Sequence, residues 1–140
     1  MRGLTTPRWT SEACPATCPE DWESARYAQS GMDVTRQLLA LEDRPTAIFA
    51  LNDLMALGAL QAAAWAHYSV PGDLAVVGYD DLELARFTIP PLTSISRPMK
   101  QITQEAVNLL AERMAGNSRQ PSCPVLAPEL IVRCSTQVDI

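Results

Sequence analysis

The segment AIFALNDLMALGAL, from Ala47 to Leu60, is apolar except for an amide and a carboxylate at its centre. The residues Thr46 to Leu51 form a short run of strand formers, which is typical of a strand buried on both faces of a sheet. The residues Asp53 to Ala66 are almost all leucine, methionine and alanine, and they predict a helix with no polar face. One side of such a helix must pack on the sheet, and another side must pack on a second helix or on a partner chain.

Apolar strands and helices continue to alternate along the chain, and this order predicts an α/β fold with a parallel sheet. The other predicted elements are a helix with a possible N-cap at Ser30, strands at Leu74 to Gly78 and Leu92 to Ser96, a helix from Pro98 to about Ala115, and one or two short strands within Pro124 to Arg133. Residues 1–20 contain three prolines and no periodic pattern, which indicates an irregular or disordered segment. The sequence therefore predicts a single domain, over residues 21–140.

Composition narrows the classes of function. The net charge of −5 would repel a phosphate backbone, so the chain alone is a poor candidate for binding nucleic acid. No apolar run approaches the ~18 residues of a membrane span, and no apolar core follows the charged N-terminus, so we expect a cytoplasmic protein without membrane contact. The four cysteines lack the spacing of a zinc site and are interpreted as free thiols. We therefore expect no metal and no cofactor.

Polar side chains follow two strands of the predicted sheet. Asn52 and Asp53 come after the first strand, and Asp80 and Asp81 come after the second. In a parallel sheet the carboxyl ends of the strands meet at one edge, beyond which ligands bind. Asn52 and Asp80 together offer donors and acceptors for neighbouring hydroxyl groups of a sugar or similar polyol. The alternative is that one member of each pair caps the helix that follows, and the two roles are compatible because each pair has two side chains.

Candidate catalytic groups have less support. Asp80 and Asp81 could hold magnesium in a phosphotransferase, but such a site also needs phosphate-binding elements, and neither a GxxxxGK(S/T) loop nor a GxGxxG loop is present. His67 lies at the predicted end of a helix, so we expect a solvated side chain there rather than a base. Trp22 could stack on a sugar ring, or it could cover the edge of the sheet. We predict no catalytic residue.

Four blocks of sequence occur in a fixed order: RPTAIFALNDLMALGALQAA, VPGDLAVVGYDDLELARFTIPPLTSISRP, EAVNLLAERMAG and PELIVRCST. With this order and spacing, residues 21–136 resemble the C-terminal part of the effector-binding domain of lactose-repressor/galactose-repressor (LacI/GalR) family transcription regulators. The resemblance implies a periplasmic-binding-protein-like, three-layer α/β sandwich, of which this chain would hold mostly one lobe. Family members bind an effector between two lobes, and binding changes the affinity of a helix-turn-helix domain for operator DNA.

The resemblance also assigns residues to roles. Asn52 and Asp80 would face the effector, and Trp22 would occupy a position that often stacks on it. The helix Asp53 to Ala66 would be the dimerisation helix. Its predicted contact residues are Met55, Gly58, Ala59 and Ala62.

Several parts of the family pattern have no match in this chain: the helix-turn-helix, the N-terminal lobe, and the first strand of the C-terminal lobe with the arginine-bearing helix after it. Residues 98–119 would form a helix that belongs to the other lobe, and the edge of the first strand would be unpaired, which favours association. We therefore predict a truncated, non-enzymatic regulator that binds a sugar-like effector, self-associates, and contacts DNA only through a domain absent from this chain. The alternatives are a sugar-binding protein of a transport system, the phosphotransferase, and a remnant without function.

Overall fold

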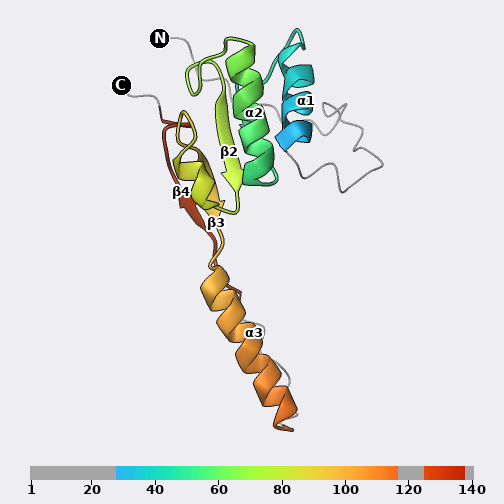
Figure 1. The fold of residues 1–140 in the computed structure, drawn as a ribbon, viewed down its shortest axis with the longest axis vertical. Helices are drawn as coiled ribbons and strands as arrows, with labels where there is room; N and C mark the ends of the chain where they lie inside the picture. Colours follow the sequence, from blue (N-terminus) through green and yellow to red (C-terminus); the bar gives the residue numbers. More distant parts are fainter. Residues whose placement is uncertain (1–27, 117–124, 138–140) are drawn as a thin grey trace.

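The structure, a computed structural model, describes residues 28–116 and 125–137. Along the chain these residues form α1 (Ala28–Leu39), β1 (Ala47–Phe49), α2 (Asp53–Trp65), β2 (Ala75–Tyr79), the 3-10 helix η2 (Glu83–Arg86), β3 (Thr93–Ser96), α3 (Met99–Met114) and β4 (Glu129–Ile131). The strands form one sheet in the order β1-β2-β3-β4. Figure 1 labels β2, β3 and β4 of this sheet. Because β1, β2 and β3 are parallel and β4 is antiparallel to β3, the predicted α/β sheet is confirmed as mostly parallel.

The strand register decides where each strand ends. Phe49 of β1 lies beside Val77 of β2, and Tyr79 of β2 lies beside Ile95 of β3. Because β1, β2 and β3 run in the same direction, their carboxyl ends meet at one edge of the sheet. The residues that follow these strands are therefore close in space, although they are far apart in the sequence.

The core lies between the sheet and α2. Val76 in β2, and Leu74 and Leu92 just before β2 and β3, are fully buried. The same core cluster contains Ala56 and Ala63, two turns apart on one face of α2, whose small side chains let the helix backbone lie close to the strands. Burial of a valine or leucine side chain contributes about 1.5–3 kcal/mol, so these contacts hold α2 on the sheet.

A second side of α2 packs against α1 through two glycines. A Cβ atom at Gly58 would collide with the carbonyl oxygen of Ala28 and would lie 2.6 Å from the amide nitrogen of Met32, both backbone atoms of α1. A Cβ atom at Gly31 would lie 2.7 Å from the Cα atom of Met55. The two glycines therefore let the helix backbones touch, and α1 supplies the second helix that the apolar α2 requires.

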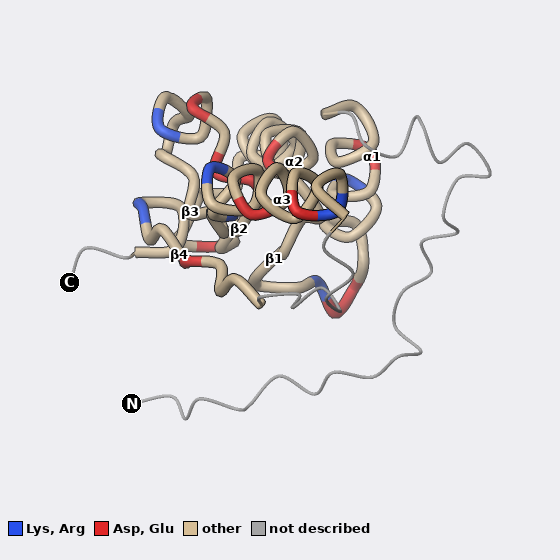
Figure 2. The backbone as a smooth tube through the Cα atoms, turned by 90° about the horizontal axis from the view of Figure 1, so that it is seen from below, with Lys and Arg blue, Asp and Glu red and all other residues tan. Residues whose placement is uncertain are grey.

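The other face of the sheet is open within the described residues. Side chains alternate between the faces of a strand, so Ile48, which packs against the core, and Phe49 point in opposite directions. Phe49 is 56% exposed, and in Figure 2 α1 and α2 lie on the same side of the sheet. The expectation that this strand is buried on both faces is wrong for this structure. The described part of the chain therefore contains the sheet and one helical layer of the expected sandwich.

β1 is an edge strand of the described sheet, because it pairs with β2 alone. This position confirms the predicted unpaired edge. Leu51, which follows β1, is 76% exposed, so apolar side chains accompany the open backbone groups of the edge. Open edges of this kind favour pairing with another strand.

α3 extends away from the sheet and from the other helices (Figure 1). None of its residues is buried, and its predicted apolar stripe is open, with Ile102 38% exposed and Leu110 61% exposed. The long amphipathic helix is therefore present, but its stripe covers nothing within the described residues. That this helix belongs to a second lobe stays a prediction.

The elements α2, β2, β3 and α3 begin and end within one residue of their predicted positions, and β4 lies within the predicted range Pro124 to Arg133. The prediction of an N-cap at Ser30 is wrong, because α1 begins at Ala28 and includes Ser30. The expectation for residues 1–20 lies outside the described residues. Among the helices of residues 28–116 and 125–137, none is both long enough and apolar enough to cross a lipid bilayer.

Candidate functional site

Polar and charged side chains gather where β1, β2 and β3 end. Asn52 follows β1, Asp80 follows β2 and Arg97 follows β3. The backbone amide of Asp80 donates to the carbonyl oxygen of Ile95 at 2.9 Å, which holds the end of β2 against β3. The structure thus places Asn52 and Asp80 at the same edge of two adjacent parallel strands, as the sequence predicts. Their contact with an effector stays a prediction.

Asn52 is the N-cap of α2. Its backbone is extended, and its side-chain oxygen accepts a hydrogen bond of 2.8 Å from the amide of Met55. This bond satisfies one of the amide groups that a helix leaves unbonded in its first turn, and such caps contribute about 1 kcal/mol. The capping alternative is therefore confirmed for Asn52, whose half-buried side chain is oriented by this bond at the sheet edge.

Asp53 turns inward, although it is the neighbour of Asn52 in the sequence. It is fully buried, its Oδ1 accepts from the hydroxyl of Ser94 at 2.6 Å, and its Oδ2 accepts from the amide of Leu82 at 2.7 Å. Gly78 provides the space for this carboxylate, because a Cβ atom there would collide with Oδ1 of Asp53. Asp53 therefore joins the start of α2 to β3 and to the loop after β2.

The hydroxyl of Ser94 also accepts a hydrogen bond of 3.1 Å from the amide of Asp81. Asp53 consequently holds two successive amides of the loop, one directly and one through Ser94. Sequence analysis gave Asp53 only a possible capping role and missed this network. The available signal was the glycine in VVGYDD, since a residue without a side chain near the end of a strand leaves room for a group from another element.

Burial raises the pKa of the Asp53 carboxyl above 3.8, and the charges of Asp80 and Asp81 act in the same direction. The hydrogen bonds from Ser94 and Leu82 favour the charged form and oppose this effect. Because the pKa is higher in the folded state, the stabilising contribution of this group is complete below pH 3.8. It is lost as the pH rises through the folded-state pKa.

We expect Asp53→Asn to remove this pH dependence. The free energy of unfolding of the wild-type chain minus that of the variant should fall as the pH rises from 3.8 toward neutrality. Urea unfolding followed by circular dichroism at several pH values measures this difference. Asp43→Asn, which changes an exposed acid before the amino end of β1, is the matched control. If the difference in free energy of unfolding grows with pH instead, the hydrogen bonds to Asp53 have a larger effect on its pKa than burial has.

Asp80 and Asp81 have backbone φ angles of 114° and 50°, in the left-handed region that few residues other than glycine adopt. Their carboxylates bind different arginines: Oδ1 of Asp80 lies 2.6 Å from Nη2 of Arg97, and Oδ1 of Asp81 lies 2.6 Å from Nη2 of Arg133. Neither aspartate caps η2, whose N-cap, Leu82, makes no side-chain hydrogen bond. The arrangement differs from a magnesium site with paired carboxylates, and the described residues contain no group of three or more metal-ligating side chains.

The two ion pairs differ in exposure. The side chains of Asp81 and Arg133 are 10% and 12% exposed, whereas those of Asp80 and Arg97 are 24% and 40% exposed. The pair with Arg133 therefore belongs to the interior of the fold. The pair with Arg97 faces solvent at the sheet edge, and sequence analysis did not include Arg97 among the candidate residues.

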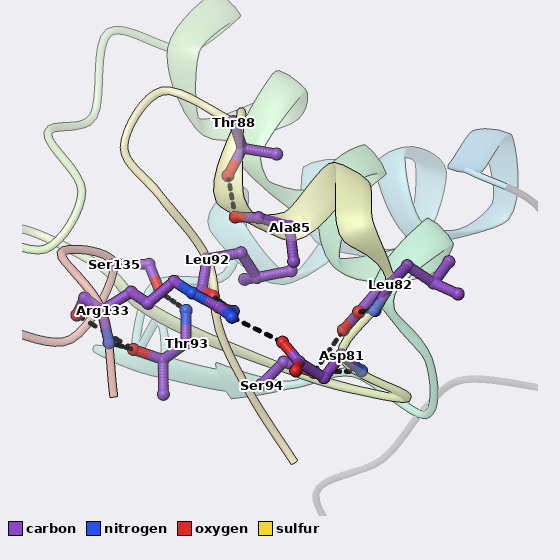
Figure 3. A network of polar contacts seen from close by, with 10 residues as sticks. Asp81, Leu82, Ala85, Thr88, Leu92, Thr93, Ser94, Arg133 and Ser135 are labelled. Atoms are coloured by element: carbon purple, nitrogen blue, oxygen red, sulfur yellow. Dashed lines mark hydrogen bonds and ion pairs between the residues drawn. The ribbon is translucent and has the colours of Figure 1, made fainter. Parts of the chain in front are cut away.

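The segment after β4 holds the loop that carries Asp81 (Figure 3). Arg133 donates to Asp81 and also to the carbonyl oxygen of Leu92, at 2.7 Å. The hydroxyl of Ser135 accepts from the amide of Thr93 at 2.8 Å and donates to a carbonyl oxygen of β2 at 2.6 Å. These contacts join β2, β3 and the C-terminal segment. Sequence analysis used the PELIVRCST block only for its resemblance and missed both roles.

The predicted self-association residues of α2 are covered within the chain. Gly58, Ala59 and Ala62 are buried, and Met55 packs partly buried against the core. α1 and the sheet occupy the sides of α2 that were predicted to face a second copy. Self-association through these residues stays a prediction, and in this structure it requires α1 to move away.

Two of the remaining predicted residues, His67 and Cys134, are within the described part of the chain. His67 is exposed just after α2, with a φ angle of 60°, as expected for a residue at a helix end. Cys134 is an exposed free thiol. Trp22, Cys14, Cys18 and Cys123 lie outside the described residues.

A groove of about 540 Å³ lies between α1, α2 and the segment after η2. Its lining includes Met32, Leu57 and the exposed side chain of Ile89. Asn52 and Asp80 are not among the lining residues, so this apolar groove is separate from the polar sheet edge.

Comparison with known proteins places the chain in a family. Residues 5–136 match the family described as periplasmic binding protein-like domain. Over 116 residues the chain is 40% identical to the HTH-type transcriptional repressor PurR of Mannheimia succiniciproducens, a match that covers 83% of this chain and 35% of the relative. The chain belongs to the LacI/GalR family. Its sheet and covering helices are part of the effector-binding domain of that family.

This LacI/GalR chain is also similar to a curated repressor and to a solved regulator structure. It is 44% identical over 105 residues to the ribose operon repressor of Escherichia coli, covering 75% of this chain and 32% of that protein. It is similar to a crystal structure of a LacI family regulator from Enterococcus faecium with bound ribose, with a TM-score of 0.71, 30% identity, and coverage of 79% of this chain and 41% of that one. The chain spans about a third of the length of the curated relatives that it matches.

Proposed function

We propose that this chain is the effector-binding portion of a LacI/GalR-family transcriptional regulator and that its effector is a sugar. The observation that carries the proposal is the position of Asn52 and Asp80 at one edge of two adjacent parallel strands. Ligands of open α/β sheets bind beyond this edge. An amide that donates and accepts, beside a carboxylate that accepts, suits the neighbouring hydroxyl groups of a sugar.

Two of the similar proteins favour a sugar over other polar effectors. The Escherichia coli relative is a ribose operon repressor, and the Enterococcus faecium structure contains ribose. By this analogy, effector binding changes the affinity of a helix-turn-helix domain for operator DNA in the cytoplasm, and the chain catalyses no reaction. A transport-system sugar-binding protein could share the fold, but both curated relatives described above are repressors.

We also propose that the chain self-associates. Association through Met55, Gly58, Ala59 and Ala62 would require α1 to leave α2. The open edge of β1, with the exposed Phe49, offers a contact that needs no such rearrangement.

Sugar binding is tested by titrating the ¹⁵N-labelled full chain with ribose and with cellobiose and following the backbone amide resonances. We expect shifts at Asn52 and Asp80 with a dissociation constant of about 1 mM, because the described residues form only one side of a cleft. If neither sugar shifts the amide resonances at this edge, the proposal of a sugar effector is contradicted. A dissociation constant in the micromolar range would contradict the interpretation that the described residues form only one side of the cleft.

Asp80→Asn is expected to weaken sugar binding about tenfold, because the neutral amide loses the charge-assisted hydrogen bond to a hydroxyl group. Asp43→Asn makes the same chemical change near the amino end of β1 and should leave the affinity unchanged. The same titration of both variants measures the difference.

A further inference from the structure

The uncovered face of the sheet carries a continuous apolar row. Phe49 lies beside Val77 of β2, and residues in register project to the same face of a sheet. Ile95 of β3 lies beside Leu130 of β4 in the same way. Tyr79, two residues after Val77 and in register with Ile95, connects the two halves of the row. Phe49 and Leu130, at its two ends, are exposed, so the row crosses all four strands on the face opposite α2.

The helix α3 carries a second apolar surface without a cover. Its exposed apolar side chains include Met99, Ile102, Leu110 and Met114, which the helical period places on one side. The helix leaves the edge where β1, β2 and β3 end and extends away from the sheet (Figure 1). An apolar sheet face and an apolar helix stripe are the two surfaces that pack together in α/β proteins. Within the described residues of one chain, these two surfaces are held apart.

We propose that two copies of the chain exchange α3, so that the helix of each copy covers the open sheet face of the other. This inference rests on the self-association proposed above and names the surfaces that it uses. In Figure 1, β2 points toward the edge from which α3 extends. A two-fold axis beside this edge therefore sets each α3 antiparallel to the parallel strands of the partner, as in a β-α-β unit. Because the contact is the same in both directions, the assembly closes as a dimer.

The path of the chain favours the sheet of the partner over the chain's own sheet. β4 is antiparallel to β3, and its first residue, Glu129, lies beside Ser96 at the end of β3. If α3 turned back over its own sheet, it would end near the opposite edge, and the chain would have to cross the same face again to reach Glu129. Because α3 projects outward instead, the chain returns to Glu129 without crossing this face, which is left for a second copy.

The size of the exchanged contact matches that of a small dimer interface. α3 has 16 residues and is therefore about 24 Å long, and a helix about 10 Å wide covers two strands that lie about 4.8 Å apart. One helix would hide about 240 Å² of the sheet and a similar area of its own surface. Exchange makes two such contacts, so the total approaches about 1,000 Å², the lower limit for a specific interface. We therefore expect a dissociation constant in the micromolar range.

The first test measures the dissociation constant of the dimer for variants of the full chain by sedimentation equilibrium. Leu110→Glu places a charge in the apolar stripe and is expected to raise the dissociation constant about 100-fold, about tenfold for each of the two contacts that contain it. Phe49→Lys, on the open sheet face, should weaken association to a similar extent. Gln104→Glu is the matched control, because it adds a charge on the side of α3 opposite Ile102, and it should leave the dissociation constant unchanged.

The second test mixes Leu110→Glu with Phe49→Lys. In a mixed dimer, the unchanged α3 of one copy packs on the unchanged sheet of the other, and the two new charges, which have opposite sign, fall together in the second contact. The mixture should therefore associate about tenfold more tightly than either variant alone. A helix that packs on its own sheet cannot produce this gain.

Each other outcome overturns the inference. If the wild-type chain remains monomeric at millimolar concentration, the proposed self-association fails and this inference fails with it. If Leu110→Glu associates as the wild type does, self-association stands but uses another surface, such as α2 or the edge of β1. If both variants weaken association and their mixture gives no gain, α3 and the sheet do not pack across copies. Circular dichroism verifies that the variants are folded, and Met114→Glu and Leu130→Lys replace any variant that is not.

Discussion

Gly58→Leu is expected to lower the free energy of unfolding by about 3 kcal/mol, the upper end of the usual cost of overpacking. The new side chain would meet the carbonyl oxygen of Ala28 and the amide nitrogen of Met32. These are backbone atoms, so they can move only if α1 moves as a whole. Leucine favours a helix by about 0.5–1 kcal/mol over glycine, so a loss of stability must come from the collision. Urea unfolding followed by circular dichroism measures the change.

Ala64→Leu is the matched control for this variant, because residue 64 lies on the exposed side of the same helix. Its free energy of unfolding should stay within about 0.5 kcal/mol of wild type. Light scattering on both variants separates folding from self-association. If Gly58→Leu unfolds at the wild-type urea concentration but no longer self-associates, this side of α2 contacts a second copy rather than α1.

Arg133→Met is expected to lower the free energy of unfolding by about 3–5 kcal/mol, the usual cost of leaving one charge of a buried pair without its partner. The carboxylate of Asp81 is 10% exposed and would lose its cation, and the carbonyl oxygen of Leu92 would lose a donor. Arg113→Met, which changes an exposed arginine in the last turn of α3, should have little effect. Urea unfolding compares the two variants.

The double variant Asp81→Asn, Arg133→Met identifies the source of this loss. Asparagine carries no charge and tolerates the left-handed backbone of position 81, which has a φ angle of 50°. Much of the stability lost in Arg133→Met should therefore return. If Arg133→Met costs no more than Arg113→Met, or if the double variant is no more stable than Arg133→Met, an unpaired buried charge at Asp81 is not the cause.

The elements of the fold could be predicted because their signals are local. The apolar strands, the apolar α2 and the amphipathic α3 each follow from residues adjacent in the sequence, and their boundaries agree within one or two residues. Burial could not be predicted in the same way. Phe49 is 56% exposed because no described helix covers its face of the sheet, and that depends on the neighbours of β1 rather than on its sequence.

The sheet edge was predictable in position but not in detail. The order of strands indicates that Asn52 and Asp80 share an edge. Which residue of each pair turns inward depends on contacts from distant segments: Gly78 and Ser94 accommodate Asp53, and the segment after β4 brings Arg133 to Asp81. The small residues of α2 posed a similar ambiguity, because a second helix of the same chain and a second copy satisfy such a surface equally well.

Two polar residues follow β1 and two follow β2, and within each pair of neighbours the two side chains have different environments. Asp53 and Asp81 bond to the interior, and the neighbouring Asn52 and Asp80 lie at the open edge with Arg97. Under the proposed function, effector contact and burial are therefore assigned to neighbouring positions, although Asn52 also caps α2. A change of effector would, under the same proposal, come from substitutions at Asn52 and Asp80, which lie directly beside the buried positions that hold the fold together.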